Sequence, residues 1–203
     1  AVAINGLLYV VGGTNDAFSG TSLQTLEIYD PQTNTWRAET AIMPTPRRAL
    51  AAGVIGSRLY AAGGYDGIAL NKLEVYEPPP DVIANGSAII AGACGSPTTA
   101  AIDPDETVTV NFTLRNRGPF DTGTLTATLQ ATGGVTAPSG PQNYDALRVG
   151  NSATRAFTFT GRGTCGDTLT ATLNVTDGTN TWVVTFPFIL GGNATTVLSE
   201  NFD

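Results

Sequence analysis

The chain has 203 residues, of which 41% are hydrophobic and 13% charged, and its net charge at pH 7 is -7. An acidic chain without a basic stripe is not expected to bind nucleic acid. The sequence contains no His, which excludes an imidazole general base, His-containing zinc, copper and iron sites, and Ser-His or Cys-His nucleophiles.

The length is sufficient for one large domain or two of ordinary size, and two are expected. Gly, Thr and β-branched residues are abundant, a composition typical of strands and turns. No apolar run approaches the roughly 18 residues that span a membrane. The chain opens on Ala1-Val2-Ala3-Ile4, a pattern typical of mid-strand, so we expect the natural N-terminus to lie further upstream.

The first elements form an internal repeat. The segment Leu-Tyr-Val-Val-Gly-Gly at residues 8–13 returns as Leu-Tyr-Ala-Ala-Gly-Gly at 59–64, which is 51 residues later. A second pair follows, Leu-Glu-Ile-Tyr-Asp-Pro at 26–31 and Leu-Glu-Val-Tyr-Glu-Pro at 73–78. A period near 50 residues suits the blade of a β-propeller. Apolar runs this short and this rich in β-branched residues predict strands.

The order of Gly-Gly, Tyr-Asp-Pro and Trp in this repeat resembles the kelch-repeat family. The resemblance covers residues 1–78 and implies an all-β fold, with two four-stranded blades of a partial propeller at 1–80. Its structural positions would be Gly12, Gly13, Tyr29, Trp36, Gly63, Gly64 and Tyr76. Pro31 and Asn34 predict a tight turn. Tyr29, Trp36 and Tyr76 are expected in the core, with Trp36 as a large apolar plug between blades.

The second repeat departs from the family pattern, because no Trp follows Tyr76 and the chain runs into Pro78-Pro79-Pro80. Prolines cannot continue a central strand, so the propeller is expected to end there. Known propellers use about four to eight blades, and two blades cannot close a ring. The missing propeller blades would come from upstream sequence or from other chains.

The remaining residues predict a second domain. Residues 81–87 are expected to form a linker, and 88–191 alternate apolar residues with Thr, Asn or Arg in about six or seven strands, the pattern of a β-sandwich. This part resembles the immunoglobulin-like or fibronectin-like domains of secreted bacterial proteins, without the antibody-type Cys, Trp and Cys spacing. Residues 192–203 are interpreted as a linker and the start of a further module.

Cys94 and Cys165 are the only cysteines, and a disulfide between them is the simplest interpretation. A closed loop of about 70 residues would stabilise the domain by roughly 4 kcal/mol in the chain-entropy model. The alternative is two reduced, buried thiols. A disulfide would place the protein outside the cytosol, so the predicted location is extracellular or at the cell surface.

Two further groups are candidate binding residues. The loops after the Gly pairs display Asn15, Asp16, Tyr65, Asp66 and Asn71, which form the candidate ligand-binding face. The acidic turn with Asp103, Asp105 and Glu106 offers oxygen ligands for a structural Ca²⁺ ion, but it lacks the spacing of an EF-hand, and a solvated turn is the favoured interpretation. Four Asn-x-Ser/Thr sequons begin at Asn85, Asn111, Asn174 and Asn193, and most are expected to carry no glycan.

These patterns favour a non-catalytic binding or structural module, with propeller loops contacting a protein or glycan and the sandwich acting as a spacer or docking domain. The alternative is a subunit of a surface assembly completed by neighbouring chains. A propeller followed by an immunoglobulin-like domain also resembles galactose oxidase in layout. That family's copper site uses His and Tyr ligands and a Tyr-Cys crosslink, which a chain without His does not supply. The resemblance therefore leaves, as a third alternative, an accessory part of a secreted enzyme of the galactose-oxidase kind.

Overall fold

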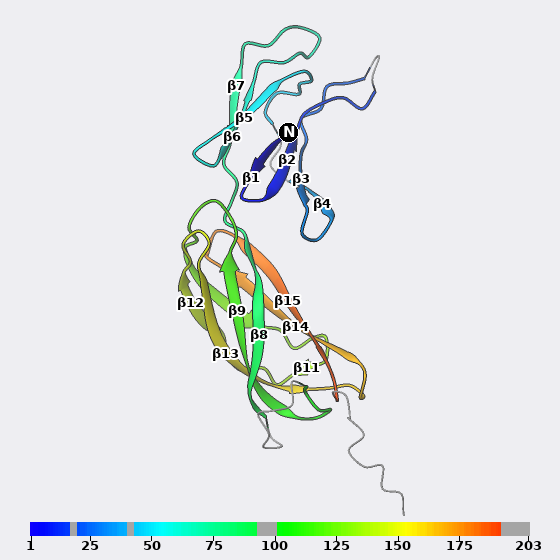
Figure 1. The fold of residues 1–203 in the computed structure, drawn as a ribbon, viewed down its shortest axis with the longest axis vertical. Helices are drawn as coiled ribbons and strands as arrows, with labels where there is room; N and C mark the ends of the chain where they lie inside the picture. The colour runs from blue at the N-terminus through cyan, green and yellow to red at the C-terminus, as the bar shows by residue number, and fades with distance from the viewer. Residues whose placement is uncertain (17–19, 40–42, 93–100, 192–203) are drawn as a thin grey trace, which may run out of the picture. The chain divides into compact units, whose positions relative to one another are not determined.

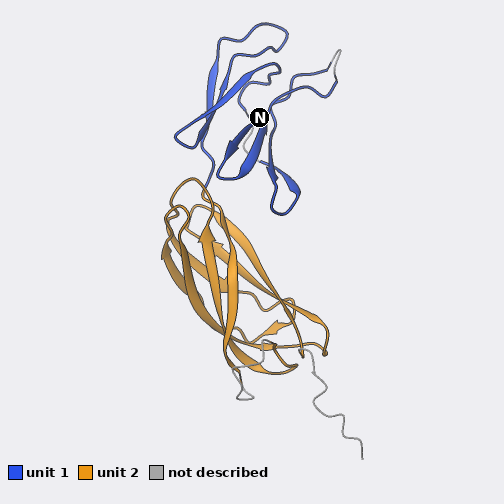
Figure 2. Cartoon of the chain, in the orientation of Figure 1, with its two compact units in different colours: residues 1–79 blue, residues 80–203 orange. Residues whose placement is uncertain are grey.

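The computed structural model describes residues 1–16, 20–39, 43–92 and 101–191, and strands are the only regular secondary structure in them. The chain is therefore all-β, as predicted. It divides into two compact units, residues 1–79 and residues 80–203 (Figures 1 and 2). No helix of the described residues is long and apolar enough to cross a membrane.

Unit 1 contains two antiparallel sheets. The first sheet has four strands in sequence order, β1 (Val2–Ile4), β2 (Leu7–Val11), β3 (Leu26–Asp30) and β4 (Thr35–Ala38). A four-residue turn joins β3 to β4, in which Asn34 takes a left-handed φ of 54° and accepts a hydrogen bond from the Tyr29 hydroxyl at 2.9 Å. The turn predicted between Pro31 and Asn34 is thus confirmed.

The second sheet has three strands, β5 (Ala51–Ile55), β6 (Arg58–Ala62) and β7 (Leu73–Tyr76). The prediction of two four-stranded blades is therefore wrong for this sheet in the described chain. After Glu77 the chain enters three consecutive prolines, whose missing N–H groups cannot extend a ladder, and it continues into unit 2.

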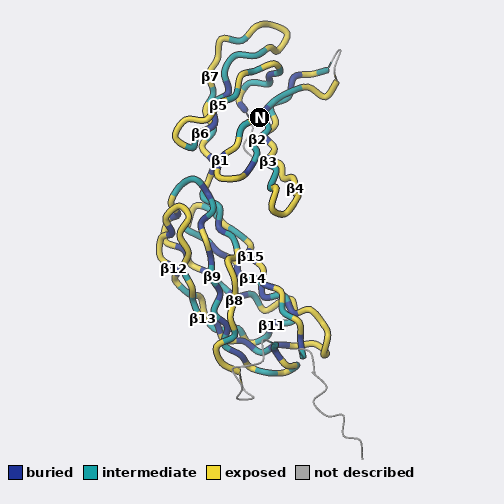
Figure 3. Tube along the Cα trace, viewed as in Figure 1, coloured by how far each residue is buried: buried dark blue, intermediate teal, exposed yellow. Residues whose placement is uncertain are grey.

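The core of unit 1 lies between these two sheets (Figure 3). Alternate residues of the first sheet supply one side, and Leu59 and Ala61 of β6 supply the other. The buried residues of the first sheet are Ile4, Leu7, Tyr9, Val11, Leu26 and Ile28.

The predicted burial of Trp36 is wrong for the described chain, because its side chain is 57% exposed. Trp36 lies opposite Tyr29 on the outermost strand, so both point to the face of the first sheet that is turned away from the core. The two rings lie 5.0 Å apart between centroids. Tyr29 and Tyr76 are each half-buried.

Unit 2 is a sandwich of two four-stranded antiparallel sheets. One sheet has the order β12 (Gln142–Ala146), β10 (Thr124–Leu129), β14 (Thr168–Thr176) and β15 (Thr181–Ile189). The other has the order β11 (Val135–Thr136), β13 (Ser152–Gly161), β9 (Thr107–Asn116) and β8 (Val82–Gly92). The predicted alternation in β9 is confirmed, since Val108, Val110, Phe112 and Leu114 are all buried in the core between the sheets.

Residues 81–87 differ from the predicted linker, because β8 already begins at Val82 and pairs with β9 from Asn116 onward. Val82 is buried, and Asp81 forms an ion pair with Arg117 at 2.8 Å. The register shifts between Ala84 and Ser87, around Gly86 with a φ of 107°. This irregularity breaks the alternation that would have revealed the start of the strand.

Candidate functional site

The two Gly pairs shape equivalent corners at the ends of β2 and β6. Gly12 and Gly63 both have a φ of +63°, in the left-handed region. A Cβ on Gly12 would lie 2.5 Å from the backbone oxygen of Arg47, and a Cβ on Gly64 would lie 2.9 Å from that of Arg48. Glycine is therefore required at these corners both for backbone conformation and for the close approach of the segment joining the sheets.

Tyr65 and Arg48 connect the loops that follow the two Gly pairs. The backbone of Arg48 forms a bridge with Tyr65, and the Ser22 hydroxyl of the first loop donates to the Tyr65 oxygen at 3.0 Å. The Arg48 guanidinium lies 5.0 Å from the centre of the Tyr65 ring, and its Nη1 donates to the Gly20 oxygen at 2.6 Å. We call Gly20, Ser22, Arg48 and Tyr65 the loop cluster.

The structure brings only one of the predicted ligand-binding residues into this cluster. Tyr65 is 40% exposed. Asn15 stabilises its own loop, because its Oδ1 accepts from the Thr21 N–H at 3.1 Å. Asp16, Asp66 and Asn71 are exposed on the two loops. Sequence reasoning missed Ser22, Arg48 and the exposed Ile68 of the second loop, for which no pattern in the sequence is diagnostic.

Arg47, the neighbour of Arg48, is fully buried and was also missed as a structural residue. Its Nη1 donates to the oxygens of Gly63 at 3.0 Å, Lys72 at 3.3 Å and Ala61 at 3.4 Å. Its Nη2 lies 2.6 Å from Oε1 of Glu74, an ion-pair contact without the alignment of a hydrogen bond. Arg47 therefore ties the segment between the sheets to β6 and β7.

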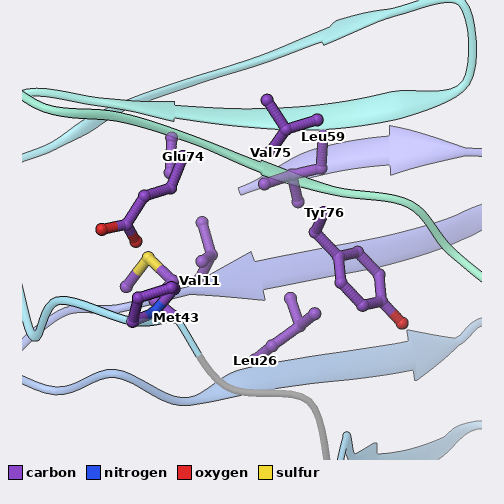
Figure 4. A pocket seen from close by; sticks show the side chains of 9 residues that line it. Val11, Leu26, Met43, Leu59, Glu74, Val75 and Tyr76 are labelled. Carbon is purple, nitrogen blue, oxygen red and sulfur yellow. The ribbon is translucent and has the colours of Figure 1, made fainter.

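A small pocket opens between the two sheets of unit 1 (Figure 4). Val11, Leu26 and Met43 line one side, and Leu59, Glu74 and Tyr76 line the other. Glu74 Oε2 is buried and forms no hydrogen bond to any described residue. Burial, together with the nearby carboxylate of Glu39, raises the pKa of Tyr76 above its usual value. The pocket is thus mostly apolar, with one unsatisfied carboxylate oxygen.

The predicted calcium-binding residues interact with different partners and do not converge on one point. Asp105 forms an ion pair with Arg162, and Glu106 Oε2 accepts from the Asp103 N–H at 2.9 Å. Within the described ranges, no group of three or more His, Cys, Asp or Glu side chains is placed to hold a metal ion. The geometry therefore supports a structured acidic turn, and Ca²⁺ binding stays a prediction.

The predicted disulfide involves one residue outside the described ranges, Cys94. Cys165 is exposed in the turn that follows β13. In the same turn Asp167 Oδ2 accepts from both the N–H and the hydroxyl of Thr164, and these hydrogen bonds lower the pKa of Asp167. The pairing of the two cysteines stays a prediction.

Comparison with known proteins identifies the family features of unit 1. The model of the kelch motif matches residues 1–40 and 46–79. Residues 1–79 carry two kelch motifs. The Kelch-like ECH-associated protein 1B of Danio rerio is 44% identical over 68 residues, 33% of this chain and 11% of that protein. The Spermatocyte protein spe-26 of Caenorhabditis elegans is 36% identical over 88 residues, which are 41% of this chain and 15% of that protein. Kelch-like protein 33 of Homo sapiens is 37% identical over 79 residues, which are 38% of this chain and 14% of that protein.

The chain thus spans between 11% and 15% of the length of these three kelch relatives. The matches support a kelch domain of the propeller type in unit 1. The family match lies within residues 1–79. The immunoglobulin-like character predicted for residues 88–191 therefore stays a prediction.

Proposed function

We propose that this chain is a non-catalytic binding module whose kelch unit contacts a protein partner through the loop cluster. The kelch motifs in residues 1–79 support a protein-binding role. The sequence contains no His, so an imidazole acid or base is unavailable to these loops. An enzymatic role therefore finds no support in the loop cluster.

The observation that carries the proposal is the joining of both loops at Tyr65 and Arg48. Tyr and Arg are the residue types most often found at the centre of protein interfaces, because each combines a large contact area with polar groups. The Ser22 hydroxyl and the Arg48 guanidinium both hold the second loop against the first. An exposed ring held in this way presents a preorganised contact to a partner.

The experiment is selection of a random peptide display library against the purified chain, followed by binding measurements with a Tyr65→Ala variant. We expect selected peptides to lose at least about tenfold in affinity on this substitution, as hot-spot residues do. Val149→Ala, an exposed position in unit 2, is the matched control and should leave binding unchanged. Peptides that bind both variants equally would locate recognition elsewhere.

A glycan remains the second ligand class of this proposal, and a glycan array with the same two variants tests it. Unit 2 would then serve as an immunoglobulin-like spacer or docking domain in an extracellular or cell-surface protein. Support for that location comes from the predicted disulfide alone. Alkylation of the purified protein without reductant tests whether Cys94 and Cys165 form a disulfide. Two reactive thiols would remove the support for an extracellular location.

Assembly with neighbouring chains is a second candidate, favoured by the outer faces of the two kelch sheets. The outer face of the first sheet carries Leu8, Val10 and Trp36, and that of the second carries Ile55 and Val75. Within the described residues of unit 1 there is no third sheet to cover either face. The outer face of the first sheet is equivalent to the inner face of the second, and the outer face of the second is equivalent to the inner face of the first. Copies could therefore stack head to tail through the same kind of packing that forms the core of unit 1. A monomer in light scattering at micromolar concentration would exclude this candidate.

A further inference from the structure

The second kelch sheet lacks a strand that the first sheet has. In the first sheet β4 pairs with β3, with Trp36 opposite Tyr29 and Arg37 opposite Ile28. β7 is the counterpart of β3, because Leu26-Glu27-Ile28-Tyr29 and Leu73-Glu74-Val75-Tyr76 occupy the same positions beside β2 and β6. Within the described residues no strand pairs with the outer edge of β7. The edge where β4 would lie in the second sheet is therefore open.

The open edge of β7 presents backbone groups in the pattern that β4 uses. The Gly63 N–H donates to the Lys72 oxygen at 2.8 Å, just beyond the β6–β7 ladder. Because antiparallel pairs alternate between hydrogen-bonded and non-hydrogen-bonded, Glu74 and Tyr76 bond to β6 while Leu73 and Val75 direct their N–H and C=O groups outward. The first sheet has the same alternation, since the Glu39 N–H donates to the oxygen of Leu26, the counterpart of Leu73.

The pocket of unit 1 lies beside Tyr76, on the face of the second sheet to which a side chain paired with Tyr76 would point. In the first sheet the rings of Tyr29 and Trp36 lie 5.0 Å apart. Tyr76, the counterpart of Tyr29, instead borders the pocket, where Glu74 Oε2 lacks a hydrogen bond to any described residue. A Trp side chain on an incoming strand would enter this apolar space, and its indole N–H is a donor for the unsatisfied carboxylate oxygen.

We propose that the open edge of β7 binds an extended, tryptophan-bearing segment of a partner protein as a fourth strand. Main-chain hydrogen bonds to Leu73, Val75 and Glu77 would give affinity, and the Trp in the pocket opposite Tyr76 would give specificity, the two contributions typical of strand addition. This site is distinct from the loop cluster and does not depend on it.

A second copy of this chain is not the occupant. The segment with the required sequence is β4, and only the four-residue turn from Pro31 to Asn34 separates it from β3. That turn is held by the hydrogen bond between Tyr29 and Asn34 and by one from the Gln32 N–H to Asp30 Oδ1 at 2.9 Å. A connection this short cannot release β4 to another molecule without breaking the first sheet.

The test uses a labelled peptide with the sequence of Pro31–Glu39 and fluorescence anisotropy with the full chain. We expect saturable binding that weakens at least about tenfold when the Trp of the peptide is replaced by Ala, because the pocket is then empty. Val75→Pro should weaken binding to a similar extent, since it removes an outward N–H without breaking the ladder to β6.

Two controls separate strand addition from unfolding or surface adhesion. Val183→Pro changes an exposed residue whose N–H also faces outward, on the edge strand β15 that already contains Pro187, and should leave binding unchanged. In the peptide, N-methylation at the position of Arg37 should abolish binding, whereas N-methylation at that of Trp36 should not, because only the former N–H faces β7.

The proposal is overturned if the peptide does not bind at about 1 mM, which corresponds to a free energy of only about 4 kcal/mol. Equal effects of the two N-methyl groups would also overturn it. Concentration-dependent dimerisation that excludes the peptide would show that a second copy is the occupant instead. Tyr65→Ala should leave peptide binding unchanged, so that failure of this site and failure of the loop cluster are distinguished.

Discussion

The hydroxyl of Tyr144 donates a hydrogen bond to the backbone oxygen of Phe112 at 2.9 Å and thereby joins the two sheets of unit 2. Tyr144 belongs to β12 in one sheet and Phe112 to β9 in the other. Both side chains are fully buried, and the ring of Phe112 also contacts those of Phe157 and Phe186. A polar bond therefore crosses the centre of an otherwise apolar core.

Replacing Tyr144 by Phe should lower the free energy of unfolding of unit 2 by about 1–2 kcal/mol, because a buried carbonyl loses its donor. Urea unfolding followed by the fluorescence of Trp182, in a Trp36→Phe background, measures this in unit 2 alone. Tyr60→Phe, a half-buried residue of unit 1, is the control and should have little effect. An unchanged midpoint for Tyr144→Phe would contradict the predicted role of the bond.

Alkaline pH should destabilise unit 2 through the same residue. Burial raises the pKa of Tyr144, so the folded state retains the proton more strongly than the unfolded chain. Stability is then fully present below the unfolded value of about 10 and falls by up to about 1.4 kcal/mol per pH unit above it. Unfolding measured between pH 8 and 11 should show this decline, and Tyr144→Phe should reduce it.

Breaking the buried ion pair between Arg47 and Glu74 should destabilise unit 1 strongly. Glu74→Gln leaves the guanidinium buried without its counter-charge, and removal of one buried partner typically costs about 3–5 kcal/mol. Glu77→Gln, which affects an exposed ion pair with Arg58, is the matched control and should cost under about 1 kcal/mol. Trp36 fluorescence in a Trp182→Phe background reports on unit 1. Similar losses for both variants would show that Arg47 is satisfied by its backbone bonds alone.

The two left-handed glycines Gly12 and Gly56 should respond differently to alanine. Their φ angles are +63° and +55°, but a Cβ on Gly12 would lie 2.5 Å from the Arg47 oxygen, whereas Gly56 faces open space. Gly56→Ala should cost about 1 kcal/mol through backbone strain, and Gly12→Ala about 3 kcal/mol, because a clash adds to the strain. Thermal unfolding of the two variants measures the difference, and equal losses would rule out the clash.

Asn116 should be among the most sensitive polar residues of unit 2. It is fully buried, its Nδ2 donates to the oxygens of Phe120 and Leu147 at 2.7 and 3.1 Å, and its Oδ1 accepts from the Gly118 N–H at 2.9 Å. Asn116→Leu should cost about 3 kcal/mol, because several buried backbone groups lose partners. Asn174→Leu, an exposed position on β14, is the control for urea unfolding and should be nearly neutral.

The strands of unit 2 were predictable where apolar and polar residues alternate regularly along them. Strands were predicted at the alternating segments 107–116, 152–160, 167–176 and 181–190, and β9, β13, β14 and β15 lie within about one residue of them. One face of each strand is covered by apolar residues. β12 was missed since Tyr144 is the only large apolar residue in its middle, between Asn143 and Asp145. The local pattern of such a short polar strand cannot be told from a turn.

The kelch signature was predictable, but burial and the site were predictable only in part. The Gly pairs and the Tyr-Asp-Pro segment located the two repeats of unit 1. The exposure of Trp36, in contrast, depends on whether another sheet covers its face, which sequence spacing does not report. Arg47 and Arg48 look alike in sequence. Only the packing of the segment between the sheets buries the first and leaves the second beside Tyr65.

The placement of β8 and β15 bears on how unit 2 would respond to a pulling force. Val82, the first residue of β8, pairs with Asn116 at one end of β9, and Leu190 bridges to Ile102 at the opposite end of the unit (Figure 1). Tension applied between Val82 and Leu190 would run along the strands and load the β8–β9 and β14–β15 hydrogen bonds together, in shear. A unit loaded in this direction would resist extension until many hydrogen bonds break at once, whereas a load that opened one strand pair after another would meet less resistance.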